Sequence, residues 1–264
     1  ACAAGATMTP MPASKPSVTN QVSARAESFR TGFGGRPMRE YKGLPIYAAP
    51  GLHEAAAEML CSALADQARV LEFGAGSGAM SLRLADLGFA VTASDLFPES
   101  FKPAHVPFVA ADLNGAFAAH WPQGFDAVMA LEIIEHLENP REVLRQIRAV
   151  LPLGGQLVLS TPNIANPVSQ ALFLRTGQFQ WFRDADYREQ GHITPLSPWV
   201  LEKALLEAGF TIRAERAVSN PFRRVRKLGW GVRLLARGFA VLGGLPPGGL
   251  EIENFNLTDA KQWA

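Results

Sequence analysis

The chain has 264 residues, of which 48% are hydrophobic and 19% charged, and its net charge is +1. This length and composition are ordinary for one large globular domain with a sizeable buried core. Two cysteines are too few for a disulfide framework or a cysteine-rich zinc module. No apolar stretch approaches the roughly 18 residues of a membrane-spanning helix, and the first residues lack the apolar centre of a signal peptide. We therefore expect a cytoplasmic protein.

Charge and composition divide the chain into three parts. Residues 1–45 are rich in Ala, Ser, Thr, Pro and Gly without a period, which predicts a disordered or loosely packed N-terminal arm. Residues 216–250 hold seven of the 25 basic residues and no acidic one, so 18 basic and 24 acidic residues remain elsewhere, a balance of −6. We assign 46–218 to a folded domain and 219–264 to a basic C-terminal extension.

Apolar runs alternate with helical patterns through the folded domain. Helices are expected at residues 53–65, 79–87, 142–150 (with Asn139 as N-cap and Pro140 at its first position) and 199–208. Strands are expected at 69–73, 89–93, 106–110, 125–131, 155–160 and 210–214. This alternation predicts an α/β fold, a doubly wound, mostly parallel sheet with helices on both faces. Ligands bind such sheets at the carboxyl ends of the strands.

A glycine-rich loop follows the first of these strands, in the order Glu72-Phe73-Gly74-Ala75-Gly76-Ser77-Gly78. Glycines allow the backbone to turn tightly into a helix and to approach a ligand closely. The loop also satisfies the dinucleotide-binding fingerprint, because Ala79 can take its last position. A tight turn without a ligand is the third interpretation.

Acidic residues at successive strand ends separate these ligand classes. Glu72 would repel a pyrophosphate but attract a cationic amine or sulfonium. Asp95 ends the second strand, where a carboxylate can accept both ribose hydroxyls. Asp112 follows the third strand and can accept from an adenine amino group. Each acid alone is also consistent with a capping or exposed carboxylate, but the ordered set favours a positively charged nucleoside.

With these motifs in this order, residues 52–214 resemble the class I S-adenosylmethionine-dependent methyltransferases. The resemblance implies a Rossmann-like sheet of seven strands and S-adenosylmethionine as the cofactor. The residues that it assigns to the cofactor are Glu72, Gly74, Gly76, Gly78, Asp95, Asp112 and Leu113. The first four would hold the methionine part, Asp95 the ribose, and the last two the adenine. No obvious partner follows the strand at 210–214, so we assign the seventh strand to residues 250–255.

A candidate metal site follows the fourth strand. In a helical turn, Glu132, Glu135 and His136 would share one face, and His192 lies in a later loop. Two carboxylates and two imidazoles can ligate a divalent cation such as magnesium or zinc. This E-x-x-E-H element, together with residues 160–163, resembles ubiquinone-biosynthesis O-methyltransferases most closely, and also small-RNA 2′-O-methyltransferases. That resemblance implies an ion near the acceptor hydroxyl.

Two other interpretations of this element stay open. His136 and Glu135 are candidate catalytic residues without a metal, with His136 as the base that deprotonates a hydroxyl. Alternatively, both are structural. Residues 165–190 carry aromatic and arginine side chains, and either cover the acceptor site or pack as a helical insertion at the sheet edge.

The C-terminal extension contains apolar residues at intervals of three or four over 222–242, with basic residues largely on the other side. This pattern is typical of a helix packed on the sheet with a solvated basic face, and also of a helix on a membrane surface, here the inner face. An RNA-contacting patch is the third interpretation, but the acidic body makes nucleic acid an unexpected partner.

We expect methyl transfer from S-adenosylmethionine to a hydroxyl oxygen of a small or lipid-like acceptor, because an oxygen acceptor needs a base or a metal. The alternatives are an RNA ribose 2′-O-methyltransferase, an NAD-dependent oxidoreductase that uses the same glycine loop, and a non-catalytic methyltransferase-like binding protein.

Overall fold

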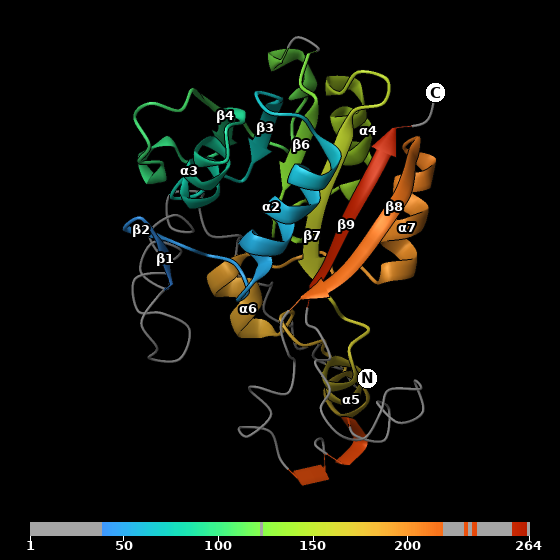
Figure 1. Ribbon diagram of the computed structural model, residues 1–264. Coiled ribbons are helices and arrows are strands. Elements are labelled where there is room, and N and C mark those ends of the chain that lie inside the picture. Colours follow the sequence, from blue (N-terminus) through green and yellow to red (C-terminus); the bar gives the residue numbers. More distant parts are fainter. Residues whose placement is uncertain (1–38, 122–123, 219–229, 232–233, 237–254, 263–264) are drawn as a thin grey trace, which may run out of the picture.

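The computed structural model describes residues 39–121, 124–218, 230–231, 234–236 and 255–262 (Figure 1). Most of the expected N-terminal arm and of the segment 222–242 therefore lies outside the described residues. Among the helices that are described, none is long and apolar enough to cross a bilayer.

A seven-stranded sheet forms the centre of the molecule, in the order β5-β4-β3-β6-β7-β9-β8. Its strands are β3 (Arg69–Phe73), β4 (Ala90–Asp95), β5 (Phe108–Ala110), β6 (Ala127–Ala130), β7 (Gln156–Pro162), β8 (Phe210–Val218) and β9 (Phe255–Gln262). The five strands from β5 to β7 run parallel, whereas β9 runs antiparallel to both of its neighbours. The predicted α/β fold with a mostly parallel sheet is confirmed.

The last strand differs from the prediction. The sequence placed it at 250–255, but β9 begins at Phe255 and inserts between β7 and β8. The predicted range therefore overlaps β9 at Phe255 only.

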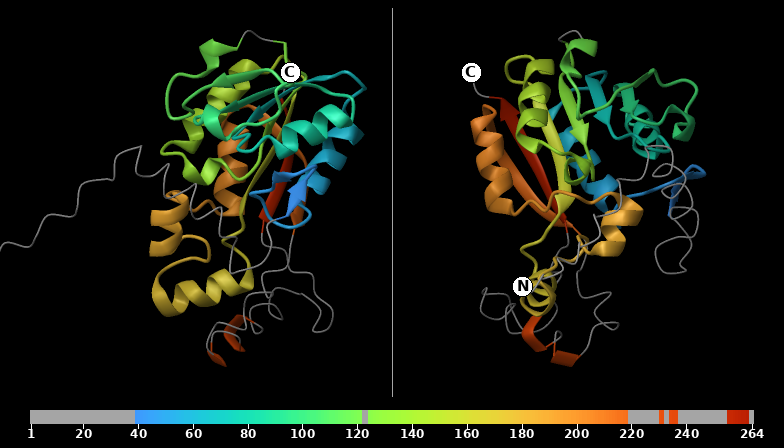
Figure 2. Two further views of the ribbon diagram at one scale, coloured as in Figure 1. Left: turned by 90° about the vertical axis from the view of Figure 1, so that its left-hand side faces the viewer. Right: turned by 180° about the vertical axis from the view of Figure 1, so that it is seen from behind.

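Helices cover both faces of the sheet (Figures 1 and 2). The helices α2 (Leu52–Ala63) and α3 (Ala79–Asp86) lie on one face, and α4 (Pro140–Val150) and α7 (Pro198–Glu207) on the other. The predicted start of α4 is confirmed: Pro140 occupies its first turn, and the Asn139 side chain accepts a hydrogen bond from the Glu142 amide at 3.2 Å. Asparagine favours a helix start because its side chain accepts a hydrogen bond from one of the free amides of the first turn. Proline favours it because it has no amide N–H that would be left without a partner.

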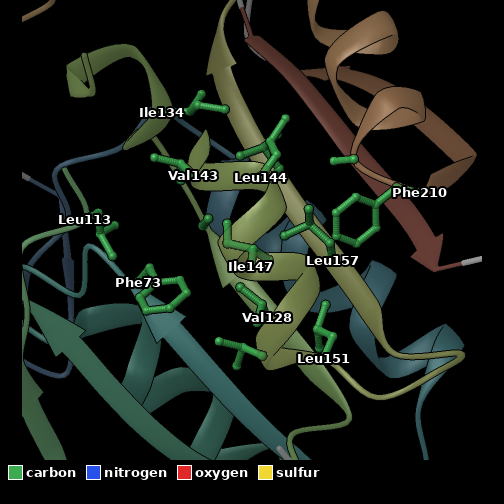
Figure 3. Close-up of a cluster of buried hydrophobic side chains, with 14 of the residues drawn as sticks. Phe73, Leu113, Val128, Ile134, Val143, Leu144, Ile147, Leu151, Leu157 and Phe210 are labelled. Carbon is green, nitrogen blue, oxygen red and sulfur yellow. The ribbon is translucent and has the colours of Figure 1, made fainter. Parts of the chain in front are cut away.

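Each face of the sheet has its own hydrophobic core. Along β3, Val70 packs on the α2 and α3 side, whereas Leu71 and Phe73 pack on the α4 and α7 side. This alternation is the period of two expected of a strand. Figure 3 shows the second core, where side chains of α4 such as Ile147 meet strand residues such as Leu157.

The end of the predicted N-terminal arm is ordered rather than loose. Strands β1 (Glu40–Tyr41) and β2 (Leu44–Pro45) form an antiparallel pair. The Tyr41 hydroxyl donates a 2.7 Å hydrogen bond to Asp86 at the end of α3. The carbonyl of Pro45 accepts a 2.6 Å hydrogen bond from Ser77, inside the glycine loop. Residues 39–45 therefore belong to the folded domain.

The insertion at 165–190 forms two helices, α5 (Pro167–Thr176) and α6 (Asp184–Gln190). Both lie beyond the carboxyl end of β7, below the sheet in Figure 1. Asn166 caps α5 by accepting hydrogen bonds from the amides of Val168 and Ser169. The insertion thus stands at the edge of the sheet where ligands of such folds bind.

Candidate active site

The glycine loop turns from β3 into α3 with glycines in the left-handed region. Gly78 has φ 86°, and a Cβ there would lie 2.8 Å from the Phe101 ring. Gly76 has φ 53°, and a Cβ there would lie 3.3 Å from the Tyr47 ring. Both glycines adopt a backbone conformation that other residues rarely adopt, and at Gly78 there is also no space for a side chain. The tight turn into a helix that the sequence predicted is therefore present.

Glu72 lies buried beneath this loop, on the α2 and α3 side of the sheet. Burial raises the pKa of its carboxyl group to about 8, and a hydrogen bond donated by Ser81 opposes part of that rise. The nearby Asp95 charge also raises it. A buried carboxyl group of this kind becomes a favourable partner for a cation, since a positive ligand would stabilise its charged form.

Asp95 lies where an acid for ribose was expected, at the end of β4, and it also braces the glycine loop. Its two carboxylate oxygens accept hydrogen bonds from the backbone amides of Gly76 at 2.8 Å and Phe97 at 3.0 Å. A carboxylate has about four acceptor positions, so two remain for ribose hydroxyls. The acid therefore fits the role that the resemblance implies.

The two adenine candidates differ in their surroundings. Asp112 is exposed, and one of its oxygens accepts a hydrogen bond from the Asn114 amide at 2.9 Å. The Leu113 side chain packs in the core beside Phe73 (Figure 3), so only its backbone is left to face an adenine ring. Together with Glu72, Asp95 and the glycines, these residues form an edge that suits S-adenosylmethionine.

A second cluster lies after β6, formed by Glu135, His136 and His192. One potential ligand atom of each residue lies within 4.8 Å of the others. The Nε2 atom of His136 lies 4.0 Å from a carboxylate oxygen of Glu135. Two ligands of one cation, each about 2.1 Å away from it, are at most about 4.2 Å apart. A small contraction of the cluster would accommodate a divalent cation.

Both imidazoles are held in one orientation by backbone carbonyls. Nδ1 of His136 lies 3.1 Å from the Gly191 carbonyl, and Nδ1 of His192 lies 2.7 Å from the Trp181 carbonyl. A carbonyl only accepts hydrogen bonds, so both Nδ1 atoms carry the proton and Nε2 is the basic nitrogen. Histidines that ligate metals or act as bases are usually oriented in this way.

Glu132 does not join this group as the sequence predicted. The chain forms a short 3-10 helix, η3 (Ile134–His136), rather than a helical turn from residue 132. Glu132 lies before η3 with φ 52°, and its carboxylate accepts a 2.7 Å hydrogen bond from Ser160. Burial and the adjacent Glu135 charge raise the pKa of Glu132 well above its ordinary value. It lies near the cluster, but not on the same helical face.

Hydrogen bonds hold the loop of His192 against η3. The Glu135 carbonyl accepts from the amides of Ile193 and Thr194, each at 3.0 Å. The Thr194 hydroxyl donates to the Leu137 carbonyl at 2.7 Å. These contacts bring the two histidines together, with ring centroids 4.8 Å apart.

Three residues near these sites were not predicted. Tyr47 covers Gly76, Ser160 holds the Glu132 carboxylate, and the Trp181 carbonyl orients His192. Ser160 lies within β7, at the start of the motif at 160–163, which offered a signal. Tyr47 lies in a segment without a motif. Trp181 belongs to the aromatic insertion at 165–190, but nothing in the sequence indicated that its carbonyl would orient His192.

The model of a family described as a methyltransferase domain matches residues 45–215. The chain belongs to the methyltransferase-domain family. This finding confirms the resemblance drawn from the glycine loop and the strand-end acids. Among curated proteins, a ubiquinone biosynthesis O-methyltransferase of Xanthomonas campestris is 38% identical over 104 residues. That alignment covers 36% of this chain and 44% of the relative, less than half of its length.

Solved structures with low sequence identity share the fold. An S-adenosylmethionine-dependent methyltransferase from Mesorhizobium loti has a TM-score of 0.54 at 18% identity, covering 79% of this methyltransferase and 96% of the neighbour. A 1,6-didemethyltoxoflavin-N1-methyltransferase from Burkholderia thailandensis, solved with S-adenosylhomocysteine, has a TM-score of 0.55 at 16% identity, covering 97% and 94%. The [4+2]-cyclase SpnF also matches, with a TM-score of 0.56 at 16% identity, covering 97% and 100%. The fold therefore does not by itself define the chemistry.

Proposed function

We propose that this methyltransferase transfers the methyl group of S-adenosylmethionine to a hydroxyl oxygen. The observation that carries the proposal is the cluster of Glu135, His136 and His192 at the carboxyl end of the sheet. A hydroxyl must lose its proton to become a good nucleophile, whereas a sulfonium methyl group needs mainly alignment and exclusion of water. Two imidazoles with basic Nε2 atoms supply the group that such an acceptor requires.

The residues of the cluster suit a divalent cation as well as a metal-free base. Glu135, His136 and His192 would hold the cation, with Glu132 close by. Two nitrogen ligands favour zinc or another borderline metal over magnesium, which prefers oxygen. When bound, such a cation lowers the pKa of a coordinated hydroxyl. Without it, Nε2 of His136 accepts the proton.

The acceptor that we propose is a small or lipid-like molecule with a phenolic hydroxyl. The partial similarity to ubiquinone biosynthesis O-methyltransferases supports this class. The aromatic insertion supports it too, since Phe173 and Phe179 stack with centroids 4.4 Å apart and Phe182 lies 5.5 Å from the His192 ring. RNA ribose is disfavoured as the acceptor, because the chain outside residues 216–250 has a net charge of −6 and would repel a nucleic acid.

The test uses the purified full chain with S-adenosylmethionine and three acceptors: a catechol with a long alkyl tail, catechol itself, and a short RNA. Mass spectrometry should detect a methoxy product from the alkyl catechol at the highest kcat/KM. Methylation of RNA alone would favour the ribose alternative. Binding of NAD in place of S-adenosylmethionine would favour the oxidoreductase. Binding of the cofactor without transfer to any hydroxyl acceptor would contradict the proposal.

A lipid-like acceptor also motivates a proposed contact with the inner face of a membrane. Leu174 on α5 is 66% exposed, and Trp230 in the C-terminal extension is 75% exposed. The seven basic residues of 216–250, without an acidic one, complement anionic lipid headgroups. Vesicles of phosphatidylcholine with phosphatidylglycerol should sediment the chain, and Leu174→Ser should weaken that binding.

Leu153 provides a matched control for this experiment. It is 65% exposed but lies before β7, at the opposite end of the sheet from α5. Leu153→Ser should bind vesicles like the wild type. Equal binding by the wild type and Leu174→Ser, or binding to pure phosphatidylcholine as strong as to the anionic mixture, would contradict this contact.

A further inference from the structure

Trp181 connects the insertion to the histidine cluster through its backbone. It lies between α5 and α6, and its carbonyl accepts the 2.7 Å hydrogen bond from Nδ1 of His192. Its φ is 70°, a left-handed conformation that is uncommon for a bulky side chain and persists only where surrounding contacts impose it. Such outliers concentrate at functional sites.

The contacts that impose this conformation surround Trp181 on both sides. Its partly buried side chain packs against the core between the sheet and the helices α2 and α3. The preceding residue, Gln180, is buried and donates its amide to the Ser169 hydroxyl on α5 at 3.1 Å. The following residue, Phe182, donates its amide to the Phe179 carbonyl at 3.1 Å. The Trp181 peptide is therefore held from both ends and aimed at His192.

His136 does not depend on the insertion in the same way. Its Nδ1 atom donates to Gly191, which lies at the start of the loop that is hydrogen-bonded to η3. Gly191 has φ 74°, and a glycine adopts this conformation without strain. His192 alone takes its orientation from a strained residue of the insertion. The two imidazoles of one cluster are therefore oriented by two different carbonyls, that of Gly191 at the C-terminus of α6 and that of Trp181 between α5 and α6.

We propose that Trp181 is a positioning residue: its left-handed backbone lets the 165–190 insertion fix the Nδ1–H tautomer of His192. Nε2 of His192 is then the basic nitrogen within the cluster of Glu135 and His136. The packing of the 165–190 insertion and the orientation of His192 are therefore coupled. If the insertion is displaced, His192 loses its orientation and the cluster is disabled. The role of that Nε2 atom rests on the proposed function, but the tautomer is measurable without turnover.

The test compares two substitutions at one backbone position. In Trp181→Val, the β-branched side chain disfavours the left-handed region, so the carbonyl should rotate away from His192. In Trp181→Gly, the left-handed conformation carries no strain, so the carbonyl should stay in place although the indole is lost. Gln67→Val is the matched control, because Gln67 also has a positive φ, 63°, but lies in the loop before β3.

The readout is the ¹⁵N NMR spectrum of histidine-labelled protein, in which the two ring nitrogens of each neutral histidine are distinguishable. The wild type, Trp181→Gly and Gln67→Val should contain the Nδ1–H form of His192, whereas Trp181→Val should lose it. In methyl-transfer assays, Trp181→Val should lower kcat at least about tenfold, the usual effect of removing a group that orients a ligating histidine. KM for S-adenosylmethionine should stay unchanged, because the cofactor edge is intact.

Two results would overturn the proposal. One is an unchanged His192 tautomer in a folded Trp181→Val protein. The other is the same loss in Trp181→Gly as in Trp181→Val, since the indole rather than the backbone would then be responsible. If the glycine variant does not fold, Trp181→Asn replaces it, because asparagine tolerates left-handed conformations. If the tautomers behave as expected but no hydroxyl is methylated, the proposed function fails and the positioning role stands.

Discussion

Replacing Glu72 by glutamine should change how the stability of this methyltransferase depends on pH. Burial raises the pKa of Glu72 from 4.5 to about 8, so the folded protein keeps a proton that the unfolded chain has lost. The free energy of unfolding therefore falls as pH rises from about 4.5 to about 8, by up to ~1.4 kcal/mol per pH unit from this group. Glutamine has a similar shape, can accept from Ser81, and does not titrate.

The difference between the two proteins isolates this contribution. Urea unfolding should be measured at about pH 5.5 and about pH 7. The free energy of unfolding of Glu72→Gln, relative to that of the wild type, should increase by about 2 kcal/mol between these two pH values. Groups common to both proteins, such as His53, cancel in the comparison. Glu215→Gln is the control, because it makes the same chemical change at an exposed glutamate on β8. A stability difference for Glu72→Gln that does not change with pH would refute the buried, proton-holding state of Glu72.

Three further predictions concern the cofactor edge and the histidine cluster. Asp95→Ala should weaken S-adenosylmethionine binding at least about tenfold by calorimetry, because the hydrogen bonds from the amides of Gly76 and Phe97 and the ribose acceptor are lost together; unchanged affinity would exclude the ribose role. Gly78→Ala should lower the melting temperature and weaken cofactor binding, since its Cβ would lie 2.8 Å from Phe101 at φ 86°, and a variant with wild-type values would contradict the steric argument. A chelator should suppress methyl transfer, and His136→Ala and His192→Ala should lower the bound metal measured by mass spectrometry; full activity in EDTA would leave His136 the role of base.

Local sequence features predicted the parallel part of the sheet well. The strand at 69–73 and the α4 start at Asn139 and Pro140 follow from apolar runs and capping chemistry, which act between near neighbours. β9 was misplaced because it pairs with β7 and β8, which lie far away in the sequence. Residues 39–45 were misjudged because their order comes from contacts with α3 and the glycine loop.

In the candidate site too, features set by local sequence were predicted and features set by distant contacts were not. The glycines and Asp95 were predicted because a ligand-binding turn has fixed chemistry at fixed spacing. The geometry of the histidine cluster was predicted only in part, since one 3-10 turn in place of an α-helical turn separates Glu132 from the group. Nothing in the local sequence at Trp181 indicates a left-handed backbone, because packing of the insertion imposes it.

The position of β9 has a consequence for how the chain is made. β7 and β8 are not neighbours in the sheet, and β9, the strand that joins them, follows both of them in the chain and is synthesised after them. Until residues 255–262 emerge, a growing chain has two strands with unsatisfied backbone groups facing each other. A fragment that ends at residue 218, after β8, would retain that gap permanently. We expect such a fragment to aggregate, and a version extended through residue 262 to remain monodisperse.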